Sequence, residues 1–412
     1  MAKTRLMPEG HWDWSVPVSF SQGWKVGNLI FVGGQVSLDK DAQLVAPGDI
    51  EAQTRNSFEF VQKVLEEGGG ELGELVKFNT WYEFEGEGAA LKDYWERMTR
   101  VRLGYLRDPG PVGTALRIAG LGYAGLLIEI DGIGAIGADK IRIMPDGHWD
   151  WSIPVPLSQG WKVDDLVFVG GQVSADARGE TVAPADIVAQ TRNTYGFIQR
   201  VLEKAGAGFS DIVQLNVFYR YDGPERALEA YLHQIHHVSR EFLKAPYPSG
   251  ITARVNGLAY EGLLVEIEAI ASLNPRKKPL SPAGHGSWPG GAPLSPGWKA
   301  GDLVYVSGQI PADSNGQIQT AGDIEAQTHK VFQNMRLVLN EAGADMGDLV
   351  KLYTFYHCNE VGEALKTYWE RMTAVRMQYL PSPGPTGTAI RVNGFAPKGQ
   401  MIEIQGIAAL EA

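Results

Sequence analysis

An arginine and a glutamate recur together three times along the 412-residue chain, twelve residues apart within each copy. A guanidinium offers planar, bidentate donors to a carboxylate, and a carboxyl group can activate water and move protons. Opposite charges that face each other across two strands can equally stabilise the sheet itself by ~0.2–1 kcal/mol. The residue types leave both interpretations open. The arginines are Arg117, Arg254 and Arg391, and the glutamates are Glu129, Glu266 and Glu403.

The whole chain repeats with the period that separates these copies. Trp24, Trp161 and Trp298 each begin the pattern W-K-x-x-[ND]-L, and they lie 137 residues apart. Solenoid repeats are about 20–50 residues long, so a unit of this length is a domain of its own. Only short polar or Gly/Pro-bearing segments separate the units, which should keep them in contact. We predict three domains, at residues 1–139, 140–276 and 277–412.

The first repeat predicts an α+β domain. Asp49 stands at an N-cap position before a helical apolar stripe that Gly68 ends. The last two strands are joined by a Gly-rich turn, which indicates a hairpin with Arg117 nearly opposite Glu129. Alternation along the final strand points Ile128 and Ile130 toward the helices and Glu129 to the other face. The predicted order is strand, helix, strand, helix, strand, strand, at residues 29–36, 50–67, 75–84, 91–105, 113–119 and 126–131.

Composition excludes several classes of protein. With 44% hydrophobic residues each domain can bury a core, which rules out a disordered chain. The net charge of −11 argues against nucleic acid as a partner. The single cysteine, Cys358, can form no internal disulfide, and no apolar run approaches the ~18 residues of a membrane span. No signal-peptide pattern opens the chain, so we expect a cytoplasmic protein without a membrane partner.

Three sequence motifs mark the repeats. They are G-[ND]-L-x-[FY]-V-[GS]-G-Q-[VI] at residues 27–36 and 301–310, D-I-x-A-Q-T in every unit, and the closing L-x-E-I-type strand. With these motifs the chain resembles the Rid family, also called YjgF/YER057c/UK114, of small imine and enamine deaminases. The resemblance implies a chorismate-mutase-like fold and a homotrimer with active sites in the clefts between subunits. Three fused units would then form an intramolecular pseudo-trimer.

The resemblance also implies roles for particular residues. It assigns catalysis to Glu129, Glu266 and Glu403, and it brings the backbone of the Gly-Gly-Gln or Ser-Gly-Gln strand end close to the ligand. Glycine permits such a close approach. The glycines concerned are Gly34, Gly171 and Gly308.

The chain departs from the family at the arginine that clamps a 2-iminoacid carboxylate. Gly113, Gly250 and Gly387 stand at that position. The arginines described above follow four residues later on the same strand face, a shift of roughly 13 Å at ~3.3 Å per residue. We therefore expect Arg117, Arg254 and Arg391 to bind the carboxylate of a longer substrate, such as a 2-aminomuconate-type enamine from aminoaromatic breakdown.

Histidines supply two weaker candidates. Each unit has a histidine in the loop near its start: His11, His148 and His285. These histidines could act as proton shuttles or bind the substrate. Alternatively, they are structural parts of a loop that tryptophans anchor. A second set, in the middle unit, has the i, i+3 spacing of metal ligands but no further ligands, so a solvated helix face is favoured. It comprises His233, His236 and His237.

We expect a hydrolase that releases ammonia from a small carboxylated enamine or imine, with no cofactor and no metal. The G-x-G-x-x-G match at residues 132–137 does not lead into a helix, so it does not indicate a dinucleotide site. The chain would act as a monomer or as a higher assembly of pseudo-trimers. The alternative is a non-catalytic ligand-binding or holdase protein; the acidic charge argues against an endoribonuclease.

Overall fold

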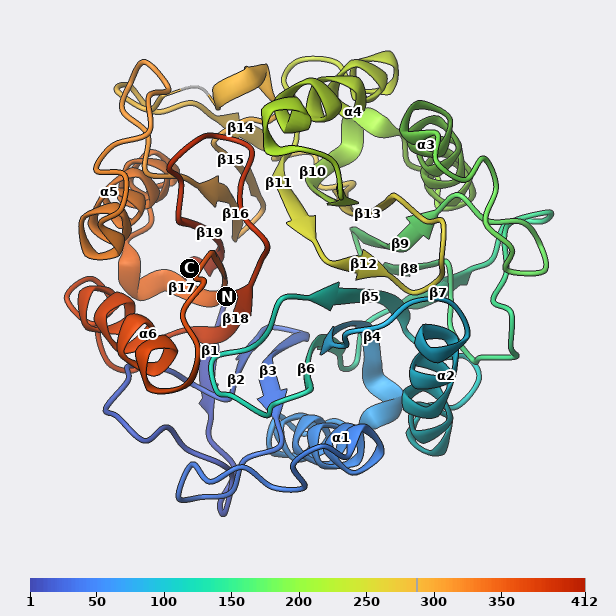
Figure 1. Cartoon of the computed structure of the whole chain (residues 1–412), viewed down its shortest axis with the longest axis horizontal. Coiled ribbons are helices and arrows are strands. Elements are labelled where there is room, and N and C mark those ends of the chain that lie inside the picture. The colour runs from blue at the N-terminus through green and yellow to red at the C-terminus, as the bar shows by residue number, and fades with distance from the viewer. Residues whose placement is uncertain (287, 412) are drawn as a thin grey trace.

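The computed structural model describes residues 1–286 and 288–411; Ser287 and Ala412 lie outside the described residues. Three similar sheets surround a common axis, with two long helices on the outside of each sheet (Figure 1). The predicted α+β fold of three tandem units is confirmed. We call residues 1–139 unit 1, 140–276 unit 2 and 277–412 unit 3, and these bounds stay predictions.

Unit 1 contains the predicted elements and two further short strands at its start. Asp49 caps the first helix, since its carboxylate accepts from the backbone N–H groups of Glu51 and Ala52. Ile128 and Ile130 pack with the helices, as predicted. The elements are β1 Lys3–Leu6, β2 Gly23–Val26, β3 Leu29–Val36, α1 Ile50–Glu67, β4 Leu75–Glu83, α2 Gly88–Tyr105, β5 Val112–Ile118 and β6 Ile128–Ala135.

Unit 3 repeats this order, and unit 2 repeats it with one additional two-residue strand, β12, which pairs with β5 of unit 1. Unit 2 has β7 Lys140–Ile143, β8 Gly160–Val163, β9 Leu166–Val173, α3 Ile187–Lys204, β10 Ile212–Arg220, α4 Leu228–Phe242, β11 Ser249–Val255, β12 Gly257–Leu258 and β13 Val265–Ser272. Unit 3 has β14 Lys278–Leu280, β15 Gly297–Ala300, β16 Leu303–Gln309, α5 Ile324–Ala342, β17 Leu349–Tyr356, α6 Gly362–Arg376, β18 Thr386–Arg391 and β19 Ile402–Ala409. Short 3-10 turns lie at Leu72–Glu74, Phe209–Asp211, Glu225–Ala227, Pro289–Gly291 and Met346–Asp348.

The predicted hairpin of the last two strands is wrong, because β4 lies between β5 and β6. Strand β4, helix α2 and strand β5 form a crossover unit, which makes β4 and β5 parallel neighbours. Along β4, Tyr82 pairs with Arg117 and Trp81 with Glu129. Consecutive residues point to opposite faces, so Arg117 lies on the helix side and Glu129 on the side of the axis.

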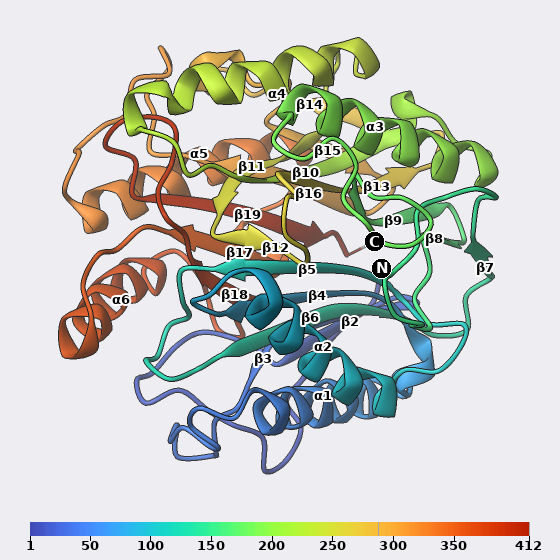
Figure 2. The ribbon, with the colours of Figure 1, turned by 45° about the vertical axis from the view of Figure 1, so that its right-hand side comes forward.

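The units contact one another in a ring. Strand β5 packs against β9, β11 against β16, and β18 against β3. The repeated tryptophan ties each unit to the one before it, because its indole N–H donates to a backbone carbonyl there: Trp24 to Gly384, Trp161 to Gly110 and Trp298 to Tyr247, at 2.8–3.0 Å. The two ends of the chain lie close together, and the Met1 amino group donates to the Leu410 carbonyl at 2.7 Å (Figure 2).

Buried charges differ among the three interfaces at the axis. The Lys77 ammonium lies 2.5 Å from the Glu268 carboxylate, and the Lys351 ammonium lies 3.0 Å from that of Asp131. All four side chains are almost inaccessible to solvent. The interface between units 2 and 3 has uncharged residues at both equivalent positions. These residues are Gln214 and Gln405.

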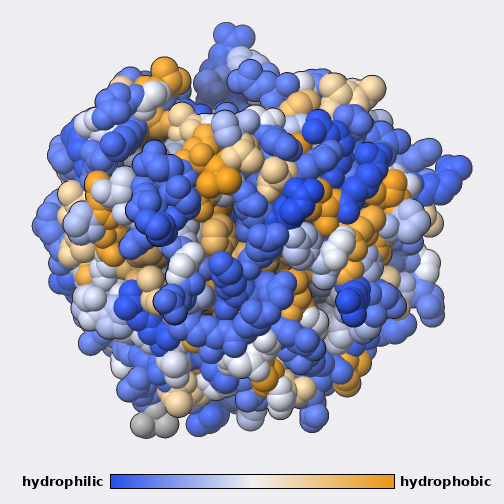
Figure 3. Space-filling view, turned by 90° about the horizontal axis from the view of Figure 1, so that it is seen from below, coloured by the Kyte–Doolittle hydropathy of each residue, from blue (hydrophilic) through white to orange (hydrophobic). Residues whose placement is uncertain are grey.

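The described residues contain no helix that is long and apolar enough to cross a membrane. The face of the molecule in Figure 3 is mostly hydrophilic, with hydrophobic residues in smaller patches between the polar ones.

We expect Lys351→Met to reduce the free energy of unfolding by about 3–5 kcal/mol, because it leaves the Asp131 carboxylate buried without a counter-charge. Urea denaturation followed by circular dichroism measures the change. The matched control is the double variant Lys351→Gln with Asp131→Gln, which copies the uncharged interface and should cost less than half as much. Equal losses for the two variants would contradict this account.

Candidate functional site

Each predicted glutamate lies against a predicted glycine, at a bulge in the neighbouring strand. The pairing of β3 with β6 shifts between Val32 and Gln35, so Gly33 and Gly34 form the bulge. A Cβ atom on Gly34 would overlap the Glu129 carboxyl group. The two other units place Gly171 against Glu266 and Gly308 against Glu403 in the same way.

Two of the glutamates also face a strand of another unit. The Glu129 carboxyl group lies next to the backbone N–H of Ala389 and the hydroxyl of Thr388, both on β18 of unit 3. Glu266 lies next to the backbone N–H of Ala115 on β5 of unit 1. Strand β18 is the edge of its sheet, and β5 pairs on its outer side with the two-residue strand β12 of unit 2, at Leu116 and Arg117. The N–H groups of Ala389 and Ala115 are therefore available to a side chain across the interface.

Burial raises the pKa of each glutamate to about 8. The Asp131 charge raises the pKa of Glu129 further, and the Lys351 ammonium opposes it. In the same way, the Glu268 charge raises the pKa of Glu266 and the Lys77 ammonium lowers it. At neutral pH all three carboxyl groups therefore hold a proton that they can donate.

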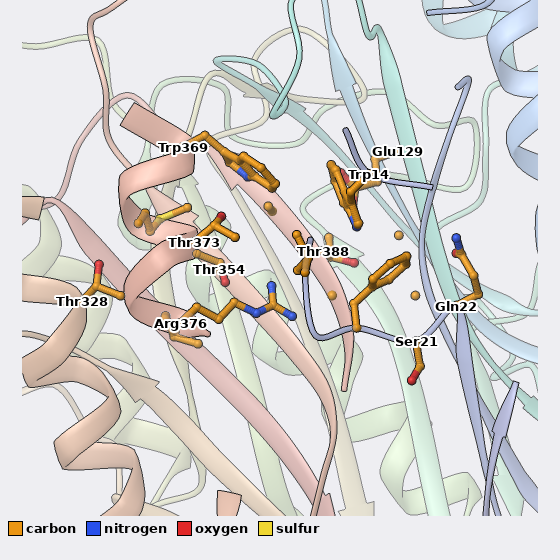
Figure 4. A pocket seen from close by; sticks show the side chains of 18 of the residues that line it. Trp14, Ser21, Gln22, Glu129, Thr328, Thr354, Trp369, Thr373, Arg376 and Thr388 are labelled. Carbon is orange, nitrogen blue, oxygen red and sulfur yellow. The ribbon is translucent and has the colours of Figure 1, made fainter. Parts of the chain in front are cut away.

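The cavity between units 3 and 1, cleft 3/1, contains the most complete site (Figure 4). Glu129 lies on one side, and Arg376 extends from the end of α6 on the other. Tryptophans form an aromatic wall between them, with the rings of Trp14 and Trp369 stacked at a centroid distance of 5.0 Å. Unit 1 contributes Trp12, Trp14, Phe20, Gly34 and Glu129, and unit 3 contributes Thr354, Trp369, Thr373, Arg376, Thr388 and Ala389, among others.

The two other inter-unit cavities differ in their polar residues. Cleft 1/2 contains Arg102 of α2 and, from unit 2, Trp151 and Leu157. Cleft 2/3 contains Glu403, but at the helix position of Arg102 and Arg376 unit 2 has Ser239.

The structure does not bring the three predicted arginines together with the glutamates. Arg117 forms an ion pair with Glu87 at 2.9 Å, and Arg254 one with Glu225 at 2.7 Å. Arg391 donates to the backbone carbonyl of Ala119 at 2.6 Å. The predicted facing of Arg117 and Glu129 was wrong; a role of these arginines in substrate binding stays a prediction.

Sequence reasoning missed the two arginines that do line the clefts, Arg102 and Arg376. Arg102 follows Trp95 by seven residues on the buried stripe of α2, where a charge is unexpected. Its guanidinium lies 5.5 Å above the Trp95 ring, and burial lowers its pKa to about 10. An arginine within an apolar helical stripe, shared by two of the three repeats, was the signal that could have identified it.

The N-terminal histidines lie beside the bulge and outside the lining of the three cavities. Each ring Nε2 lies 2.7 Å from the amide oxygen of the glutamine that follows the bulge. Burial lowers the pKa of His11 and His148 to about 4. Through these contacts the histidines support the bulge. Their action as proton shuttles or as ligands for substrate stays a prediction. The pairs are His11–Gln35, His148–Gln172 and His285–Gln309.

The helix histidines of unit 2 do not all lie on a solvated face. His233 and His237 are exposed, but His236 is 3% exposed and lines cleft 2/3. The predicted solvated face is thus wrong for His236, because the loop of unit 3 around Gly290 covers it. No group of three or more His, Cys, Asp or Glu that could hold a metal ion occurs among the described residues.

Residues 15–136, 152–273 and 289–410 each match the protein family described as Endoribonuclease L-PSP. The chain belongs to this family. It is 33% identical over 119 residues to a RutC family protein of Pyrococcus abyssi, a match of 29% of this chain and 87% of that protein. It is 31% identical over 119 residues to the 3-aminoacrylate deaminase RutC of Acinetobacter baylyi, covering 28% and 86%.

Among solved structures, a chorismatase superposes on 82% of this chain and 93% of its own, with a TM-score of 0.56 and 11% identity. That likeness concerns the fold. The family that the sequence motifs indicated is confirmed, in three tandem copies.

We expect Gly34→Ala to destabilise the chain by about 1–3 kcal/mol, because the added methyl group must displace the Glu129 carboxyl group. Chemical denaturation measures the change. Gly104→Ala is the control in the same unit, since that helical glycine is exposed and has free space around it, and this substitution should stabilise by about 0.5–1 kcal/mol. A Gly34→Ala variant as stable as the parent chain would refute the tight approach.

Proposed function

We propose that the chain is an enamine and imine deaminase, a hydrolase that releases ammonia at clefts between its units. The observation that carries the proposal is the protonated glutamate at each interface, buried against a glycine bulge. A carboxyl group with a pKa of about 8 can donate a proton at neutral pH and then accept one. The relative named 3-aminoacrylate deaminase, whose name denotes an enamine of a small carboxylic acid, supports this choice.

In cleft 3/1 the reaction would begin with transfer of the Glu129 proton to the enamine carbon, which leaves an iminium carbon and a carboxylate. The carboxylate would then take a proton from water as the water oxygen bonds to that carbon. Glu129 would then give its proton to the carbinolamine nitrogen, and as the C–N bond breaks and ammonia leaves, the C=O bond forms and the hydroxyl proton returns to the Glu129 carboxylate. Overall, enamine and water yield a carbonyl compound and ammonia, and Glu129 ends protonated as it began.

We propose a carboxylated, unsaturated enamine as the substrate, of which a 2-aminomuconate-type compound is one candidate. The aromatic walls of cleft 3/1 favour a planar, conjugated molecule, and a guanidinium is available for a carboxylate. The position of Arg117 gives no support for a longer substrate, because Arg117 lies on the opposite face of the sheet from Glu129.

The test is ammonia release from freshly generated 3-aminoacrylate and 2-aminomuconate. The parent chain should deaminate at least one of them well above the spontaneous rate. Glu129→Gln should lower kcat by 10²-fold or more at cleft 3/1, since the amide keeps the shape but cannot supply the acid. The total rate of ammonia release should fall by the fraction that cleft 3/1 contributes. The triple variant Glu129→Gln, Glu266→Gln and Glu403→Gln should be inactive.

Binding without turnover of either compound would instead favour the non-catalytic ligand-binding protein. An RNA-cleaving activity that persists in the triple variant would indicate a contaminant.

A further inference from the structure

Arg376 is the one charged side chain of unit 3 among the residues that line cleft 3/1. It is the last residue of α6, and its guanidinium reaches into the cavity toward β18 (Figure 4). A Cβ atom on Gly387 would lie 3.4 Å from both terminal nitrogens of Arg376. The guanidinium therefore lies beside Gly387. This is the strand position at which the resemblance to the Rid family implies an arginine.

The Arg376 guanidinium has no protein counter-charge within the described residues. Its Nε and Nη2 atoms are inaccessible to solvent and lack a hydrogen-bond partner there. Burial lowers its pKa to about 10, which leaves it charged at neutral pH. Glu129 in the same cavity is protonated at that pH and does not neutralise it. A buried cation without a partner is costly, so a bound anion would stabilise the cavity.

We propose that Arg376 binds the carboxylate of the substrate in cleft 3/1, so that the family's strand-borne clamp is replaced by one from the end of a helix. This inference rests on the proposed function and names the group that selects the substrate. A guanidinium binds a carboxylate through two parallel N–H donors, which would fix the orientation of the conjugated chain relative to Glu129.

The two other clefts differ in this respect. In cleft 1/2 the equivalent guanidinium, that of Arg102, already donates to the Thr99 hydroxyl and stacks over Trp95. In cleft 2/3 the equivalent residue is Ser239, whose hydroxyl donates to the Ile235 carbonyl within its own helix. We therefore expect cleft 3/1 to bind a carboxylate most strongly of the three clefts. Cleft 2/3 has no arginine at this position and should not select a carboxylate.

The test measures binding of benzoate, an unreactive planar carboxylate, to the full chain by isothermal titration calorimetry. Benzamide is the uncharged probe of the same shape and should bind at least tenfold more weakly. Arg376→Met should lose one benzoate site, whereas Arg376→Lys should retain it with reduced affinity because a single ammonium cannot bind in the bidentate manner. Unchanged benzoate affinity and stoichiometry in Arg376→Met would overturn the proposal.

Two further variants keep the result clear if Arg376→Met is poorly folded. Arg376→Met with Gly387→Arg returns an arginine to the strand, in the space that the methionine leaves free, and should recover the lost site. Arg391→Met decides between the two candidate clamp arginines of unit 3, Arg376 and Arg391. It should retain benzoate; loss of benzoate in Arg391→Met with retention in Arg376→Met would favour the strand arginine.

The measurement is independent of catalysis. If Arg376→Met loses benzoate but the parent chain releases no ammonia, the clamp stands and the proposed reaction is wrong. If the parent chain releases ammonia but Arg376→Met retains the benzoate site with unchanged affinity, the reaction stands and the clamp is wrong.

Discussion

The site depends on the close approach of an outer strand of one unit, β5, β11 or β18, to the glycine bulge of the next unit. A Cβ atom on Gly33 would lie 3.1 Å from the Cβ of Thr386 in unit 3, and one on Gly170 would lie 3.0 Å from that of Val112 in unit 1. The same bulge leaves the space that the glutamate carboxyl group fills. Because the two walls belong to different units, closing the ring of units and assembling the site are one event.

The low accessibility of this junction explains its electrostatics. A carboxyl group in such a place loses its hydration, so the proton stays bound above neutral pH. The ion pairs at the axis, Lys77–Glu268 and Lys351–Asp131, keep the neighbouring charges balanced in two of the clefts. Glu403 has glutamines at the equivalent positions and reaches a similar pKa through burial. Neutral glutamates thus arise in differently charged surroundings.

Fusion of the units into one chain allows the clefts to differ. In a trimer of identical subunits every substitution appears in all three clefts, whereas here each cleft has its own pair of walls. Arg376, Arg102 and Ser239 stand at one helix position and give the three clefts different polar residues. Glu129 and Glu403 line their cavities, whereas Glu266 lies outside the lining of the cavity in cleft 1/2. A single chain can in this way combine a cleft that selects a carboxylate with one that does not.

The repeat and the helix that Asp49 starts could be predicted, because they follow from local patterns. The contact of Gly34 with Glu129 could not, since it depends on the pairing of β3 with β6 across a bulge. The partner of β5 could not, since the insertion of β4 beside it depends on a crossover through α2. The burial of His236 depends on a loop of unit 3 around Gly290, far away in the sequence. Arg376 was missed because its surroundings come from two units.

The protonation of the interface glutamates is the claim on which the account of the site rests most directly. A carbon-13 NMR titration of the side-chain carboxyl carbons, with Glu129→Gln to assign one resonance, measures it. The account predicts that the Glu129 resonance titrates near pH 8. Titration of that carboxyl group below pH 5, as for a solvated glutamate, would contradict it.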